Sequence, residues 1–248
     1  MKKIITLKNL SKYYYYPARH EKTVKGIISS FLRREKFYAL NDISLEIFDG
    51  DFIGIIGKNG AGKTILLKIL AGIVFPSLGE VIIKKPVSPI FQYGAGFHED
   101  LTGRENIFFY AALLGIKKDY VVKNFDYIVD FSELENFLDI KIRYFSIGMR
   151  VRLAFSVASL LTSDILLLDE ALSIGDQSFV AKAHKKIKEL QQNGVTTIIT
   201  SHSLEIIRKF CKKGFVLNKG KLLFSGDINS SISYYEEEIL NQKVQIVS

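Results

Sequence analysis

The segment that most restricts the fold of this chain is Gly57-Lys58-Asn59-Gly60-Ala61-Gly62-Lys63-Thr64. It follows the apolar segment Phe52–Ile56 and leads into a helical pattern over Lys63–Leu70, so a strand, a tight loop and a helix are expected in succession. Glycines let backbone N–H groups turn inward, and the helix start adds about half a positive charge. The segment therefore predicts a phosphate-binding loop, in which Lys63 reaches the β- and γ-phosphates of a bound ligand and Thr64 binds Mg²⁺.

Short β-rich segments alternate with helical patterns along the chain. The predicted strands are Ile4–Lys8, Ile43–Phe48, Phe52–Ile56, Glu80–Ile83, Ile165–Leu168 and Thr196–Thr200. Those that begin at Phe52, Ile165 and Thr196 are almost continuously apolar, as expected of strands buried on both faces of a mainly parallel sheet. Helices over Lys63–Leu70 and Lys182–Gln192 would cover these faces, so the sequence predicts an α/β sandwich.

Residues from about 94 to 163 lose this strand character. Their pattern predicts helices over Ile107–Leu114, Val121–Phe131 and Arg150–Leu161, which indicates a helical subdomain inserted into the α/β core. Further on, Phe215–Phe224 predicts a hairpin whose turn is marked by Asn218 and Gly220. We expect one domain over residues 1–226 and a tail over 227–248 that holds a short acidic helix.

Residues 17–36 carry a separate basic and amphipathic pattern. Val24, Ile27, Ile28, Phe31 and Leu32 fall on one face of a helix, and six basic against two acidic residues leave a local charge of +4. Two interpretations stay open. The helix packs its apolar face on its own domain, or it lies against a membrane surface or a membrane partner.

Acidic and imidazole side chains follow two of the buried strands. Asp169 and Glu170 end the strand that begins at Ile165, and His202 follows the next strand through Ser201. Ligands of α/β sheets bind at the carboxyl ends of strands. We expect Asp169 to hold Mg²⁺, Glu170 to orient and deprotonate an attacking water, and His202 to hydrogen-bond the γ-phosphate or hold that water.

The segment Phe145-Ser146-Ile147-Gly148-Met149-Arg150-Val151-Arg152 precedes a predicted helix and offers a hydroxyl and backbone N–H groups to a phosphate. Together with the phosphate loop, the Asp169-Glu170 pair and His202, it resembles the Leu-Ser-Gly-Gly-Gln signature of ABC-type ATPases. Phe, Ile and Met replace three signature residues, whereas Ser146 and Gly148 are retained.

The resemblance covers nearly the whole chain. It implies the P-loop NTPase fold of ABC ATPases, with a mainly parallel sheet core, an antiparallel β subdomain and an inserted helical subdomain. It also implies that two chains close head to tail around two ATP molecules, with Ser146 and Gly148 of one chain capping the nucleotide held by the other.

Three further site residues come from the resemblance alone. Gln92 is similar to the residue that links Mg²⁺ to the membrane subunit, and Asp176 lies in what resembles the loop that bridges the two sites. An aromatic residue after the first strand stacks on adenine in the family. Spacing favours Tyr14 for this role, although the run Tyr13–Tyr16 leaves the choice open.

Two stretches, Gly94–Ile107 and Ser146–Ser156, resemble the branch of the family that exports polysaccharides such as O-antigens, teichoic acids and capsular polymers. This likeness implies a homodimer, two copies of a separate integral membrane subunit and a lipid-linked glycan substrate. It places the protein peripherally at the cytoplasmic face of the inner (plasma) membrane. The basic segment before Tyr38 is similar to an insertion near the channel mouth in that branch, and the C-terminal sugar-binding domain of some members is expected to be missing.

Other functions are weighed against this one by charge and spacing. The net charge of +8 permits a nucleic-acid ATPase, but DNA-repair members place long coiled coils between the phosphate loop and the signature, whereas Gly62 and Ser146 are only 84 positions apart. We therefore expect no nucleic-acid partner. An ATPase that signals to a membrane partner without transport, or one that energises export of another substrate, has the same core and stays open.

Overall fold

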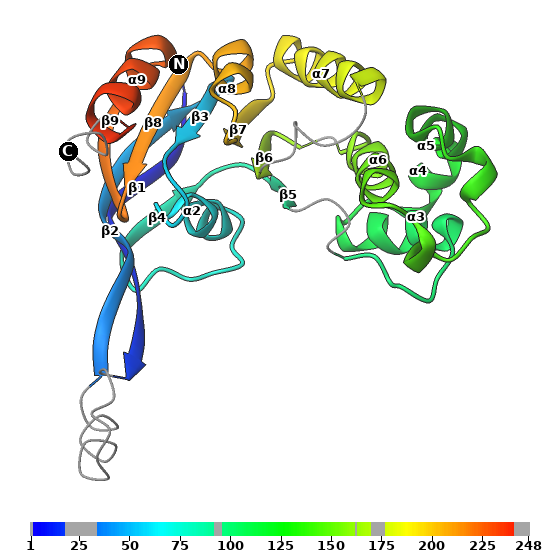
Figure 1. Cartoon of the computed structure of the whole chain (residues 1–248), viewed down its shortest axis with the longest axis horizontal. Helices are drawn as coiled ribbons and strands as arrows, with labels where there is room; N and C mark the ends of the chain where they lie inside the picture. Colours follow the sequence, from blue (N-terminus) through cyan, green and yellow to red (C-terminus); the bar gives the residue numbers. More distant parts are fainter. Residues whose placement is uncertain (1, 18–33, 92–95, 162, 170–176, 241–248) are drawn as a thin grey trace, which may run out of the picture. The chain divides into compact units, whose positions relative to one another are not determined.

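The computed structural model describes residues 2–17, 34–91, 96–161, 163–169 and 177–240 (Figure 1). The chain divides into two compact units. The first unit comprises residues 1–48, 55–84 and 214–248, and the second comprises residues 49–54 and 85–213.

The first unit holds a three-stranded antiparallel sheet in the order β2-β1-β4. Its strands are β1 (Lys3–Pro17), β2 (Arg34–Phe48) and β4 (Leu78–Ile83). The side chains of Ile5, Leu7 and Ile43 in β1 and β2 are at most 1% exposed, so this sheet packs its apolar side chains into a core. The predicted antiparallel subdomain is confirmed.

Strands β1 and β2 are longer than the sequence predicted, because Tyr13–Tyr16 pair with Glu35–Tyr38 as a two-stranded ribbon (Figure 1). Aromatic residues favour strands and stabilise each other across them. The Tyr13 ring contacts the Tyr38 ring at a centroid distance of 5.5 Å and lies 4.3 Å from the Lys36 ammonium.

The predicted basic helix over 17–36 therefore needs a correction at both ends. Pro17 and residues 34–36 belong to the ribbon and not to a helix. The apolar face from Val24 to Leu32 lies outside the described residues.

A six-stranded sheet has the order β5-β6-β7-β3-β8-β9. The strands are β3 (Phe52–Ile56), β5 (Val87–Phe91), β6 (Ile165–Asp169), β7 (Thr196–Thr200), β8 (Lys213–Asn218) and β9 (Lys221–Asp227). Every residue of β3, β6 and β7 is buried, as the apolar sequences predicted, and β5, β6 and β7 pair in parallel. Strand β3 is shared, since the division between the units follows Gly54.

Strand β5 is not in the set predicted from sequence. Pro86 precedes it and Pro89 lies within it, and proline usually excludes a central strand. Here β5 forms the edge of the sheet, where a missing N–H leaves no ladder bond unmade, so the proline is tolerated.

The second unit holds helices and 3₁₀ turns (Figure 1). They are α3 (Gly103–Leu113), α4 (Lys118–Lys123), α5 (Phe125–Ser132), the 3₁₀ turns η1 (Glu135–Phe137) and η2 (Ile142–Tyr144), α6 (Ile147–Ala158), α7 (Gln177–Gln192) and α8 (Leu204–Phe210). Helices α3 to α6 pack around one core, in which Ile107, Ile128 and Leu153 are fully buried. Phe179 of α7 makes separate edge contacts with Phe131 and Phe155.

The helix predicted over Val121–Phe131 is two helices, α4 and α5. The helix is interrupted at Asn124, which has φ −111°. Its side-chain amide donates to the Tyr120 carbonyl over 2.8 Å. An asparagine that bonds the backbone in this way competes with helix continuation. Hydrophobic periodicity is unchanged across such a break, so the sequence pattern does not reveal it.

The hairpin predicted over Phe215–Phe224 is confirmed as β8 and β9. Its two turn residues, Lys219 and Gly220, have φ of 46° and 77°, the left-handed pair that a tight hairpin turn requires. Helix α9 (Ile228–Tyr234) and a π-helical turn η3 (Tyr235–Leu240) follow, and the acidic residues Glu236, Glu237 and Glu238 lie in η3. The division into a domain over 1–226 and a tail over 227–248 stays a prediction.

Among the described residues, no helix combines the length and apolar character needed to cross a bilayer.

Cys211, the single cysteine, is 4% exposed, and burial raises the pKa of its thiol to about 12. At neutral pH its thiol is therefore protonated and unreactive.

Two glycines with left-handed backbone provide a matched test of packing in the first unit. A Cβ at Gly79, with φ of 86°, would lie 2.4 Å from the Asn9 carbonyl oxygen, whereas a Cβ at Gly72, with φ of 70°, would meet nothing within 4 Å. We expect Gly72→Ala to lower the free energy of unfolding by about 1 kcal/mol and Gly79→Ala to lower it by about 2 to 4 kcal/mol. Urea unfolding of both variants measures the difference. Equal losses would show that the close approach at Gly79 is relieved by backbone movement.

Candidate nucleotide-binding site

The phosphate loop joins β3 to α2 (Lys63–Leu70) in the first unit, as predicted. Gly62 has φ of 107°, and a Cβ there would lie 2.6 Å from the Ala39 carbonyl oxygen. A Cβ at Gly57 would lie 2.4 Å from the carbonyl oxygen of Leu217. Strands β2 and β8 thus press against both ends of the loop, and only glycine fits at these two positions.

The middle of the loop is fixed by backbone hydrogen bonds but is open on its outer side. Ala61 donates from its N–H to the Lys58 carbonyl over 3.1 Å, and its own carbonyl accepts from Gly220 N–H at 3.0 Å. Asn59 and Gly60 are exposed, and a Cβ built on Gly60 meets nothing within 4 Å. The loop is therefore rigid on its inner side and accessible to a ligand on its outer side.

Lys63 places its ammonium inside the curl of the loop. Its Nζ donates to the carbonyls of Gly57 and Lys58 over 2.8 and 3.3 Å, and the residue is only 7% exposed. Helix α2 has no side-chain cap, and its second residue, Thr64, is exposed. Unsatisfied N–H groups at a helix start, a held ammonium and an adjacent hydroxyl suit a polyphosphate with its metal ion.

Asp169 ends β6 in the second unit and is 6% exposed. It lies opposite Thr200, the last residue of β7, and its Oδ1 accepts a hydrogen bond from the Thr200 hydroxyl. No motif in the sequence had assigned Thr200 a role. The only signal available was its position at the end of a neighbouring parallel strand, where side chains reach the same sheet edge.

His202 lies two residues beyond β7 and is exposed. Ser203 follows as the N-cap of α8, and its N–H donates to the Ser201 hydroxyl over 3.1 Å. His202 thus leaves the sheet at the carboxyl edge, as predicted, at the same edge as Asp169.

Ser146 is the N-cap of α6. Its Oγ accepts a hydrogen bond from the Met149 N–H over 3.2 Å, and Ser146 and Ile147 are both exposed. A serine hydroxyl that accepts one hydrogen bond can still donate its own proton. Ser146 and the half-buried Gly148 therefore present donors at an accessible helix start, in a form that suits an anion.

Tyr14 lies in β1 opposite Phe37 and is 43% exposed, with the Lys12 ammonium 5.1 Å from its ring centroid. Alternation along the strand puts Tyr14 and Tyr16 on one face and Tyr13 and Tyr15 on the other. An adenine contact for Tyr14 stays a prediction.

The predicted site residues fall into three groups. The phosphate loop and Tyr14 lie in the first unit, and Asp169, His202 and Ser146 lie in the second. Gln92, Glu170 and Asp176 lie outside the described residues.

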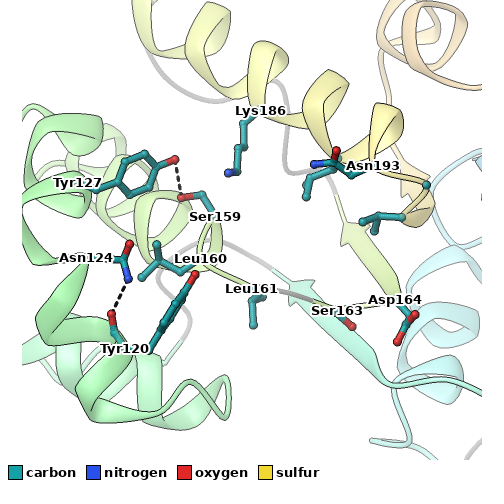
Figure 2. Close-up of a pocket in the computed structure, with 13 residues that line it drawn as sticks. Tyr120, Asn124, Tyr127, Ser159, Leu160, Leu161, Ser163, Asp164, Lys186 and Asn193 are labelled. Atoms are coloured by element: carbon teal, nitrogen blue, oxygen red, sulfur yellow. Dashed lines mark hydrogen bonds between the residues drawn. The ribbon is translucent and has the colours of Figure 1, made fainter.

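A pocket of about 530 Å³ lies elsewhere in the second unit (Figure 2). It includes Asp164 and Val195, which precede β6 and β7, so it sits at the end of these strands opposite to Asp169. Several of its polar groups already bond within the chain. Ser159 donates to the Tyr127 hydroxyl over 3.3 Å, and the amide of Asn124 donates to the backbone of α4 (Figure 2). It is not the nucleotide site.

Comparison with known proteins agrees with this geometry. The family described as ABC transporter matches residues 40–173. The O-antigen export system ATP-binding protein RfbB of Klebsiella pneumoniae is 36% identical over 245 residues, which cover 96% of this chain and 99% of that protein. The teichoic acids export ATP-binding protein TagH of Staphylococcus saprophyticus is 35% identical, covering 94% of this chain and 88% of that protein.

The fold is also similar to solved structures. A dimeric ATP-binding cassette in a post-hydrolysis state, bound to ADP and Pi, aligns with a TM-score of 0.72 at 23% identity, covering 91% of this chain and 99% of that one. An ATP-binding subunit of an ABC transporter aligns with a TM-score of 0.73 at 19% identity, covering 99% of this chain and all of that one.

A phosphate loop after a buried strand and a carboxylate at the carboxyl edge of a parallel sheet define a P-loop ATPase. Within that class, the chain belongs to the ABC transporter family. The predicted fold class and the predicted ATP-hydrolysing activity are confirmed.

The hydrogen bond from Thr200 to Asp169 gives a test of the predicted Mg²⁺ site. Thr200→Val removes the donor while keeping the shape, and Thr200→Ser keeps it. Because partners of metal-binding carboxylates orient them, we expect Thr200→Val to raise the Mg²⁺ concentration that gives half-maximal ATP turnover about tenfold, with Thr200→Ser close to the parent. An unchanged Mg²⁺ dependence in a folded Thr200→Val protein would remove Asp169 from the metal site.

Proposed function

We propose that this chain is the ATP-hydrolysing subunit of an exporter that moves a lipid-linked glycan across the cytoplasmic membrane. The observation that carries the proposal is the similarity to the Klebsiella pneumoniae O-antigen export protein, which extends over nearly all of both chains. The teichoic acid export protein, from a second polysaccharide system, supports the same substrate class. The two stretches Gly94–Ile107 and Ser146–Ser156 point to this branch independently of overall identity.

The residues of the first unit would bind and orient the nucleotide. Lys63 and the N–H groups at the start of α2 hold the β- and γ-phosphates, and Tyr14 stacks on adenine. Because Lys63 is already held by two carbonyls of its own loop, its ammonium needs little reordering when a phosphate arrives. This preorganisation favours tight binding of the triphosphate.

The residues of the second unit would carry the chemistry. Thr64 of the first unit, Asp169 and Gln92 hold Mg²⁺, which neutralises phosphate charge when bound. Glu170 accepts the proton of the water that attacks the γ-phosphate in line, and His202 hydrogen-bonds that phosphate. Positioning and electrostatics then supply most of the rate enhancement.

Each nucleotide would be shared by two copies of the chain. Ser146 and Gly148 of one copy cap the γ-phosphate held by the loop of the other, and Asp176 bridges the two sites. The exposed position of Ser146 and Ile147 at the start of α6 supports this arrangement, because a cap for another chain must be accessible. The dimeric state of a solved cassette with the same fold supports it as well.

The same proposal places the dimer peripherally at the cytoplasmic face of the plasma membrane, on two copies of an integral membrane subunit and without a nucleic-acid partner. The lack of a membrane-spanning helix among the described residues agrees with a separate membrane subunit. The basic stretch over residues 17–36 would face the membrane or that subunit, because its net charge of +4 suits an anionic lipid surface.

The role of Glu170 is tested by Glu170→Gln. Removing the general base should lower ATP turnover roughly 10² to 10⁴-fold while leaving ATP affinity in place. We expect the variant to accumulate as a closed dimer with ATP, which sedimentation with and without the nucleotide measures. Turnover at the parental rate would contradict the assignment of Glu170.

A further inference from the structure

Two arginines flank the cap residue Ser146, one three positions before it and one four positions after it. Arg150 binds Glu99 with two parallel contacts, from Nη1 to Oε1 at 2.5 Å and from Nη2 to Oε2 at 3.1 Å. Arg143 pairs with Asp100 through Nη2 and Oδ1. Two adjacent carboxylates therefore hold both sides of the same short segment.

Arg150 also binds the backbone that leads into Ser146. Its Nε lies 3.4 Å from the Phe145 carbonyl oxygen, to which it donates. The Phe145 side chain is 6% exposed and packs on Gly103, where a Cβ would lie 3.0 Å from the phenyl Cζ. The peptide just before the cap is thus held by a guanidinium on one side and by a buried ring on the other.

The loop that carries Glu99 and Asp100 is itself rigid. Asn106 is fully buried, and its Oδ1 accepts from the His98 N–H over 2.8 Å. Its amide lies 2.9 to 3.1 Å from the carbonyls of His98, Leu101 and Thr102, to which it donates. A single side chain in the core therefore fixes the backbone of residues 98–102.

Backbone hydrogen bonds join this loop to the segment that precedes the cap. Gly103 N–H donates to the Ile140 carbonyl over 3.0 Å, and Ile142 N–H donates to the Leu101 carbonyl over 2.9 Å. Thr102 and Lys141 form an isolated antiparallel bridge. These hydrogen bonds connect the loop to the segment that leads into Ser146. A displacement of Glu99 or Asp100 would therefore also displace Ser146.

We propose that Glu99, Asp100, Arg143 and Arg150 form an electrostatic clasp that sets the orientation of Ser146 and Gly148 toward the shared nucleotide. The clasp rests on the proposed function, because it acts through the cap. Its members are positioning residues, and they contact no nucleotide.

We expect the Glu99–Arg150 pair to act by orienting the cap and to contribute little to the free energy of folding. Glu99 is 57% exposed at its side chain and Arg150 is 26% exposed, and pairs at such sites add little to folding stability. A bidentate arginine–carboxylate contact nevertheless fixes the direction of both groups. The hydrogen bond from the Arg150 guanidinium lowers the pKa of Glu99, so this carboxyl stays ionised at neutral pH. Loss of the clasp should therefore alter the cap without unfolding the protein.

The experiment combines charge reversal with a charge swap. Glu99→Arg and Arg150→Glu each remove the pair, the double variant restores it with reversed polarity, and Asp139→Asn is the matched control. Asp139 pairs with Arg104 at 2.9 Å in the same group of helices and does not contact residues 143–150 through any described ion pair. For each variant, kcat and KM of ATP hydrolysis, ATP affinity and thermal unfolding are measured.

We expect each single reversal to lower kcat about tenfold, because the bidentate charged contact that orients the cap is lost. ATP affinity and unfolding temperature should stay close to the parental values, because the change is confined to the cap. The double variant should recover to within roughly threefold of the parent, and Asp139→Asn should stay at the parental rate. Parental kcat in both single variants, or no recovery in a folded double variant, overturns the clasp.

Ser146→Arg separates the clasp from the function on which it rests. If Ser146→Arg abolishes turnover while Glu99→Arg and Arg150→Glu both hydrolyse ATP at the parental rate, the cap stands and only the clasp is wrong. If Ser146→Arg hydrolyses ATP at the parental rate, the cap itself is wrong, and the clasp is overturned with it.

Discussion

The structure depends on a close approach of backbone to backbone around the phosphate loop. Gly57 and Gly62 lie so near to the carbonyl oxygens of Leu217 and Ala39 that a side chain at either glycine would clash with the facing oxygen. The antiparallel sheet and the β8–β9 hairpin thus pack directly against the loop. This contact explains why Lys63 can be held inside the curl by two carbonyls, and why the start of α2 stays open to an anion.

In the second unit, polar groups lie at one edge of a sheet whose strands are buried. Asp169 and Thr200 satisfy each other at the ends of paired parallel strands, so a buried carboxylate is not left without a donor. Helix α6 then presents Ser146 at an exposed start, and the loop fixed by Asn106 holds that start by two ion pairs. An accessible cap needs such support, because no described residue of its own chain buries Ser146 or Ile147.

Local signals in the sequence were sufficient for much of the fold. The phosphate loop, the three buried strands and the β8–β9 turn each depend on residues within a few positions of one another. Strand β5 was missed because Pro89 suggests a break, and only its place at the sheet edge makes the proline acceptable. The extension of β1 through Tyr13–Tyr16 was missed because it depends on pairing with a strand that follows an intervening segment.

The site shows the same division. Lys63, Asp169 and His202 were predicted as site residues because each follows or ends a strand at a recognisable place. The contacts of Thr200 with Asp169 and of Glu99 with Arg150 join residues 31 and 51 positions apart. Strand register and loop path decide such pairs, and no spacing in the sequence reports them.

The central claim is that two chains share each ATP, one supplying Lys63 and the other Ser146. Mixing tests it directly, with both chains carrying Glu170→Gln so that hydrolysis does not release the nucleotide. Neither Lys63→Ala nor Ser146→Arg should form an ATP-bound dimer alone, but a mixed dimer has one intact pocket. We predict that the mixture forms dimers that retain one ATP each, measured by sedimentation and nucleotide content. A mixture that stays monomeric, or a Ser146→Arg chain that dimerises alone with two ATP, would contradict the account.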